Sequence, residues 1–113
     1  MTYQEIDTLI ESIGLPYAYH QFPIPETGEE GQQPPFICWF LDGIDDLYAD
    51  NSNYQRIVTL VIEFYSDEKD FETEATIESS LKAAGFSFGM QEDYIDSERM
   101  HETVYTMEVV ING

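Results

Sequence analysis

The residues of this chain that could do nucleophilic chemistry are one cysteine and two histidines. Cys38 with His20 or His101 would form a dyad in which imidazole activates the thiol. Nucleophilic cysteines lie in electropositive, partly exposed surroundings. Cys38 instead stands in the apolar run FICWF at residues 36–40 of an acidic chain. The favoured interpretation is therefore a buried thiol that packs as a small hydrophobe, although the dyad stays open.

A second group of candidates is the acidic stretch from Asp42 to Asp50, which suggests a calcium site because hard cations prefer clustered carboxylate oxygens. It lacks the alternating ligand spacing of an EF-hand loop and the closing glutamate. An acidic turn between strands is the favoured interpretation, and we expect no metal and no other cofactor. Phosphate-binding, nucleophile-elbow and paired-cysteine motifs are absent from the sequence, so we do not expect an enzyme.

The charge balance restricts the partners that this chain can bind. The sequence has 23 acidic and 4 basic residues, a formal net charge of −19. Binding to a phosphate backbone needs a patch of Lys and Arg, which four scattered cations do not supply. We expect neither sequence-specific nucleic-acid binding nor membrane binding. The acid forms a self-repelling soluble surface, a surface that DNA slides past, or an imitation of DNA.

Length and composition predict a single domain over residues 1–113, since this is a common domain size. Hydrophobic residues make up 42% of the chain, which is enough for a core. The start of the chain lacks a basic and apolar signal region, and no run of about 18 apolar residues occurs. These features predict that the protein is made and folded in a cytoplasm.

The element that would position any site is the β-rich run Tyr54–Ser66, which we expect to be the central strand. Its even-numbered side chains are apolar from Val58 to Phe64, and this face is assigned to the core. Its odd-numbered face is mixed, and it is a candidate for contact with another subunit. The residues of that mixed face are Ile57, Thr59, Val61 and Tyr65.

The patterns on either side of that strand predict an α+β fold in the order α-β-β-β-α-β-β. We expect a mostly antiparallel sheet with two helices packed on one face. The flanking elements expected are a helix over Tyr3–Ile13, strands over Tyr17–Phe22 and Pro35–Leu41, a helix from Ser66 or Asp67 to Gly85 with Phe71 on its buried side, and strands over Phe86–Met90 and His101–Asn112.

Two connections are candidate contact regions in an assembly. Pro23–Pro35 is rich in proline and long for a loop of a compact domain, and such loops tend to be functional. Asp42–Asn53 is predicted to be an acidic turn. The candidate subunit or partner contacts are Pro25, Glu26, Glu29, Glu30, Trp39, Ile44, Asp45, Asp46, Tyr48 and Tyr65.

Three features together resemble the small tail terminator, or tail completion and head–tail joining, proteins of long-tailed phages and prophages. The first is the short amphipathic helix followed by a polar, proline-rich loop and a hydrophobic strand. The second is the strand-to-helix pattern YQRIVTLVIEFYSDEKDFETEATIESSLKAAGF. The third is DYIDSERMHETVYTMEVV, which leads into an alternating final strand.

The resemblance implies a non-enzymatic virion protein that forms a ring, often hexameric, at the end of the tail tube. Its partners would be copies of itself, the tail tube protein and the head connector proteins, with DNA passing through the ring. It would assemble in the host cytoplasm and then belong to the neck of the virion. Two alternatives stay open, namely an acidic DNA-mimic inhibitor of a DNA-binding enzyme and an adaptor that binds a peptide at a sheet edge.

Overall fold

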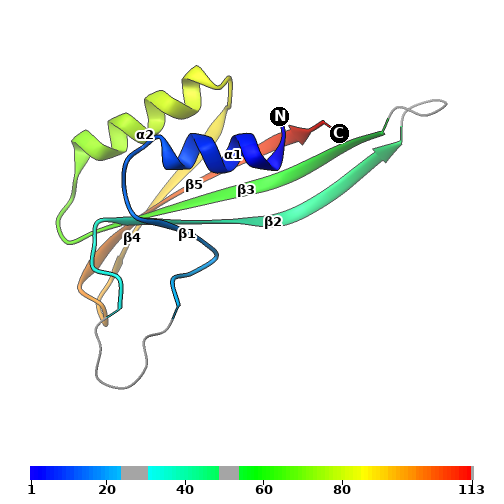
Figure 1. The fold of residues 1–113 in the computed structure, drawn as a ribbon. Coiled ribbons are helices and arrows are strands. Elements are labelled where there is room, and N and C mark those ends of the chain that lie inside the picture. The colour runs from blue at the N-terminus through cyan, green and yellow to red at the C-terminus, as the bar shows by residue number, and fades with distance from the viewer. Residues whose placement is uncertain (24–30, 49–53, 113) are drawn as a thin grey trace.

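A computed structural model describes residues 1–23, 31–48 and 54–112, with only the backbone described at residues 47, 48 and 54. One five-stranded sheet carries two helices on the same side (Figure 1). The elements in chain order are α1 (Tyr3–Glu11), β1 (Tyr17–Tyr19), β2 (Phe36–Tyr48), β3 (Tyr54–Ser66), α2 (Phe71–Ala83), β4 (Phe88–Ile95) and β5 (Met100–Ile111). The predicted α+β class and element order are confirmed.

The strands lie in the order β1-β2-β3-β5-β4, so β3 is the central strand, as its composition predicts. The short β1 runs parallel to β2, and the other three pairs are antiparallel. Because β3 pairs with β2 on one side and β5 on the other, its backbone groups are satisfied on both edges over most of its length.

The core lies between the sheet and the two helices (Figure 1). On β3 the alternate side chains from Val58 to Phe64 are fully buried, which confirms the predicted core face. Helix α1 contributes Ile6 and Ile10, while α2 contributes Ile77 and Leu81, the latter two spaced one helical turn apart. Each such buried side chain contributes about 1.5–3 kcal/mol relative to an exposed one. On β5, the alternate side chains from Thr103 to Ile111 are likewise buried.

The first helix follows its sequence signals closely. The Thr2 hydroxyl accepts from the Glu5 amide at 3.1 Å, and the Glu5 carboxylate accepts from the Thr2 amide at 3.1 Å, forming a capping box. Gly14 has a φ of 90°, the left-handed conformation expected just beyond the helix end. Strand β1 is shorter than the predicted Tyr17–Phe22, because His20 has a φ of 70° and leaves the strand.

The prediction that Asp42 and Gly43 end the second strand was wrong. The register between β2 and β3 shifts between Leu41 and Gly43, so Asp42 is accommodated as a bulge. Strand β2 then continues to Tyr48, paired with the first half of β3. The predicted acidic turn is therefore largely a strand, and its remaining residues, 49–53, lie outside the described ones.

The start of the second helix also needs correction. Ser66 is the last residue of β3, and the N-cap is Asp70, whose carboxylate accepts from the Thr73 amide at 3.0 Å. Phe71 was predicted on the buried side but is 73% exposed. Glu74 occupies that side instead, where Lys69 Nζ donates to its Oε1 at 2.7 Å. A carboxylate can stay buried there because the lysine pairs with it.

The fourth strand extends further than the predicted Phe86–Met90. It starts at Phe88 and continues through the polar stretch to Ile95, paired with β5 along its whole length. Polar residues are compatible with a strand here, because β4 lies at the edge of the sheet and most of its side chains are exposed. Arg99, with a φ of 53°, completes the turn that leads into β5.

Candidate functional site

The sheet has two unlike faces, and the candidate site lies on the face opposite the helices. The core side chains alternate with side chains that point to the other face, over which no described helix packs (Figure 1). We call this the helix-free face. Its central side chains are Phe36, Cys38 and Phe40 of β2, Val61, Glu63 and Tyr65 of β3, and Glu102 and Val104 of β5.

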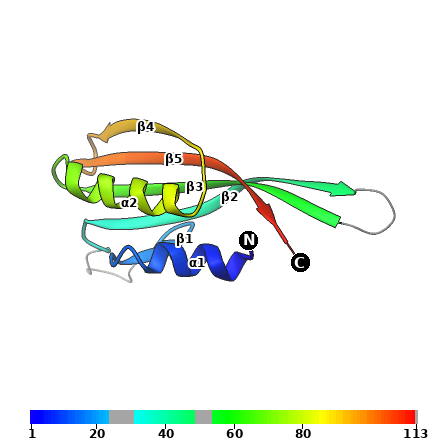
Figure 2. The same ribbon diagram turned by 90° about the horizontal axis from the view of Figure 1, so that it is seen from above.

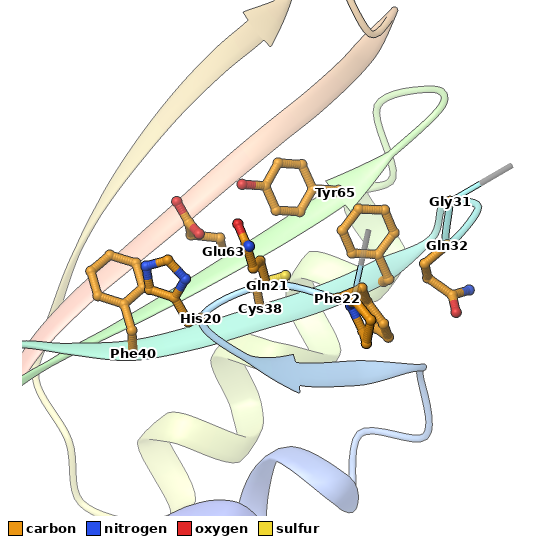
Figure 3. Close-up of a pocket in the computed structure, with 11 residues that line it drawn as sticks. His20, Gln21, Phe22, Gly31, Gln32, Cys38, Phe40, Glu63 and Tyr65 are labelled. Carbon is orange, nitrogen blue, oxygen red and sulfur yellow. The ribbon is translucent and has the colours of Figure 1, made fainter. Parts of the chain in front are cut away.

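A cavity of about 540 Å³ opens on the helix-free face (Figure 3). Residues 20–23 and 31–32 line it together with β2 and β3. The His20 amide donates to the Trp39 carbonyl at 2.7 Å. The positive φ of His20 turns the chain there, so that the residues after it lie over β2. The cavity is thus formed between the sheet and the segment that follows β1.

Aromatic rings form one wall of this cavity. The Phe36 and Tyr65 rings stack with centroids 4.8 Å apart and planes at 25°. Phe22 meets Phe36 edge-on, with centroids 5.3 Å apart. These contacts explain why Phe36 is only 9% exposed although no described helix covers it.

Two glutamates lie beside those rings and interact with each other. The Tyr65 hydroxyl donates to Glu102 Oε2 at 2.7 Å. Burial of Glu63, its hydrogen bond with Glu102 and the charge of Glu102 together raise the pKa of Glu63 to about 7. Glu63 is therefore partly protonated near neutral pH.

The cysteine of this cavity is poorly suited to nucleophilic chemistry. Burial and the charge of Glu63 raise the pKa of Cys38 to about 11, so the thiol is protonated at neutral pH. Cys38 is 5% exposed, in agreement with the predicted buried thiol. Of the two candidate bases, His20 lines the same cavity and packs against Phe40, whereas His101 meets Tyr94 of β4 edge-on.

The predicted contact residues lie in different parts of the structure. Tyr65 lies half-buried on the helix-free face, while Ile44, Asp45 and Asp46 are exposed on the second half of β2. Trp39 is 6% exposed and belongs to the core, with its ring edge-on to Tyr19 at 4.8 Å, so it is not part of the accessible surface. The predicted contacts Pro25, Glu26, Glu29 and Glu30 lie outside the described residues, and only the backbone of Tyr48 is described.

The second half of β2 and the first half of β3 form a hairpin that extends beyond the helices (Figure 2). Strand β5 accompanies β3 only as far as Arg56, so the hairpin beyond that point has two strands. Arg56 fixes its base, because Nε and a second guanidinium nitrogen donate to Asp46 at 2.6 and 3.2 Å. Ile44 is 54% exposed on this hairpin, an apolar side chain available for contact.

Several residues of this face were not singled out from the sequence. Glu63 could have been noticed in the sequence, because it is a charged residue within the mostly apolar stretch that forms β3. Glu102 and Phe22 carried no such signal, because their proximity to Glu63 and Phe36 depends on strand register and on the chain reversal at His20.

The described residues contain no group of three or more His, Cys, Asp or Glu side chains placed to hold a metal ion. Within the same ranges, neither helix is long and apolar enough to cross a membrane.

No protein-family model and no curated protein matches this sequence. The fold, in contrast, is similar to that of a chain in the solved structure described as "Virion of native gene transfer agent (GTA) particle". The TM-score is 0.56 at 15% sequence identity, and the similarity covers 98% of this chain and 91% of that chain. The two proteins therefore share a fold over nearly their whole lengths.

Proposed function

We propose that this protein is a non-enzymatic structural component of a phage or phage-like virion. The observation that carries the proposal is the shared fold with a chain of a gene transfer agent virion, which extends over nearly all of both chains. Two chains that match from end to end have the same set of elements available for contacts with neighbours. The described surface of this protein also offers partner contacts in the exposed hairpin and the helix-free face.

Within the virion, we propose the role of a tail terminator. Copies of the chain form a ring, with hexamers the expected size, that ends the tail tube and joins it to the head connector. Ring closure needs a heterologous contact, in which one surface of each copy meets a different surface of the next. The hairpin carrying Ile44, Asp45 and Asp46 is suited to this, because it extends away from the body of its own subunit (Figure 1).

The excess acid fits this role because a ring at the neck must let DNA pass. Carboxylates that line the bore would repel the phosphates and keep the genome from adhering. The DNA-mimic alternative requires an exposed array of carboxylates at phosphate-like spacing. The helix-free face has aromatic and aliphatic side chains at its centre, which supports a protein contact over a mimic of DNA.

Deletion of the gene in a particle-producing strain tests the role. We expect separate heads and tails, with tail tubes that are not stopped at their normal length, and rescue by the gene supplied on a plasmid. Electron microscopy of the lysate is the measurement. Normal joined particles from the deletion strain would contradict the proposal.

A pair of variants tests the hairpin contact. Ile44→Asp places a charge at an exposed apolar position of the hairpin and should abolish rescue. Phe71→Asp makes the same kind of change at a position that is 73% exposed on α2, and it should rescue normally. Equal rescue by both variants would exclude Ile44 from the contact.

A further inference from the structure

The helix-free face carries charge of one sign. The charged side chains that the described strands direct to it are Asp45, Glu63, Asp93, Glu102 and Glu108. Arg56, the strand residue with a positive charge, points to the other face, where it bonds Asp46 and Tyr3. The face therefore has carboxylates among and around its aromatic and aliphatic side chains, with no Lys or Arg from the described strands.

The Glu63–Glu102 pair is unfavourable for the isolated chain. Two carboxyl groups approach each other beside aromatic rings, and Tyr65 is the one described hydroxyl that donates to either of them. A positively charged group placed between them would relieve the repulsion and favour the ionised form of Glu63. The neighbouring cavity of about 540 Å³ has the room to admit such a group.

We propose that the helix-free face docks a basic segment of a different virion protein, one of whose Lys or Arg side chains enters the cavity beside Glu63 and Glu102. The methylene stem of such a side chain packs against Phe22 and Phe36, and its cationic end meets the carboxylates. Aromatic rings add attraction for a cation through their faces. This inference deepens the proposed function and rests on it for the origin of the partner.

A second copy of this chain is a poor occupant of the face. The chain has only four basic residues among 113. Of these, Arg56 is held by Asp46 and Lys69 is held by Glu74 and Glu92. A second copy would therefore bring mostly carboxylates toward carboxylates, which costs free energy, whereas a basic partner is complementary.

A short synthetic peptide of alternating leucine and lysine is the probe for this surface. The isotope-labelled protein is titrated with the peptide while amide chemical shifts are recorded, and anisotropy of a labelled peptide gives the dissociation constant. We expect shift changes confined to residues 20–22, 36–40, 61–65 and 102–104, which line the cavity or lie beside it. A peptide of alternating leucine and glutamate should cause none.

Two double variants, each of which replaces two carboxyl groups, decide between a specific site and general electrostatic attraction. Glu63→Gln with Glu102→Gln should weaken peptide binding by about tenfold or more, as expected for the loss of a charge-paired contact. Asp96→Asn with Glu98→Gln replaces two carboxyl groups of the turn between β4 and β5 and should leave the dissociation constant unchanged. Circular dichroism confirms that each variant is folded, and the shift map of the unaltered chain does not depend on the variants.

Three results would overturn the inference. Shift changes spread over the acidic start of α2, with equal weakening in both double variants, would show general attraction. Absence of binding by the unaltered protein would show that the face does not take a basic segment. Shift changes in the same residues on raising the protein concentration alone would assign the face to contacts between copies. None of these results depends on the gene-deletion phenotype, so failure of the docking site and failure of the virion role are distinguishable.

Discussion

The two faces of β3 differ although they belong to one strand. On the helix-covered face Leu60 and Ile62 are fully buried, whereas on the helix-free face their neighbours Glu63 and Tyr65 are half-buried and polar. The covered face has only to fill space under α1 and α2. The helix-free face keeps polar groups among its aromatic rings, and we propose that these groups meet a partner.

Matched truncations on the two faces of β3 test whether the faces differ in their contribution to stability. Ile62→Ala removes a fully buried side chain and should lower the free energy of unfolding by about 2–5 kcal/mol. Ile57→Ala makes the same change at a half-buried position of the opposite face and should cost about 1 kcal/mol or less. Chemical denaturation followed by circular dichroism measures both. Equal losses of unfolding free energy would show that the helix-free face contributes as much to stability as the core.

The next largest effect on stability is expected at the buried carboxylate of Glu74 on α2. Lys69 bonds Glu74, whose side chain is 5% exposed, and it also pairs with Glu92 of β4. Lys69→Ala would leave Glu74 buried without its cation and should cost about 1–3 kcal/mol in unfolding free energy. Adding Glu74→Gln to that variant should recover part of the loss. If the double variant is less stable than Lys69→Ala alone, the pairing argument fails.

A smaller effect, which depends on pH, is expected for the contribution of Glu63 on the helix-free face to the free energy of unfolding. The groups that face Glu63 are Glu102 on β5, Tyr65 on its own strand, Cys38 on β2 and His20 beyond β1. Because the pKa of Glu63 is raised to about 7 in the folded chain, its protonated form is favoured by folding. That stability is fully present below the ordinary glutamate pKa and is lost as the pH rises through about 7.

Glu63→Gln should therefore stabilise the protein at alkaline pH by about 1 kcal/mol, after allowance for solvent screening, and change little at acid pH. Thermal unfolding across the pH range measures this difference. Glu98→Gln, in an exposed turn, is the control and should be neutral throughout. Destabilisation by Glu63→Gln at alkaline pH would contradict the account of the pair.

The smallest effect is expected at the most exposed aromatic side chain. Phe71 is 73% exposed, and its ring lies 5.0 Å from Lys69 Nζ. Phe71→Ala should change the unfolding free energy by no more than about 0.5 kcal/mol, since surface substitutions away from special features do little. A loss comparable to that of Ile62→Ala would place Phe71 in the core after all.

The helix-covered face of β3 could be predicted from the sequence, because burial of one face of a strand makes every second residue apolar. The alternation on β3 acts locally, and it predicted the core face of that strand correctly. Element limits were less predictable where pairing overrode composition. Asp42 looked like a strand end but became a bulge, because the long β3 offers partners beyond it.

The candidate site was less predictable, because it depends on contacts between distant segments. Tyr65 and the mixed face of β3 were identified from alternation alone. The approach of Glu102 to Glu63 follows from the register of β3 with β5, and the Phe22 contact follows from the turn at His20. Neither is encoded in a short pattern. Trp39 was misplaced because an apolar strand shows no sign of which face meets the helices.

The measurement that tests the central claim most directly is the solution mass by light scattering across protein concentrations. A subunit of a ring should give a mass several times that of the 13.0 kDa chain, with a hexamer the expected limit, either alone or after addition of tail tubes. Ile44→Asp should reduce that mass and Phe71→Asp should not. A mass of one chain at every concentration, with and without tubes, would contradict the account.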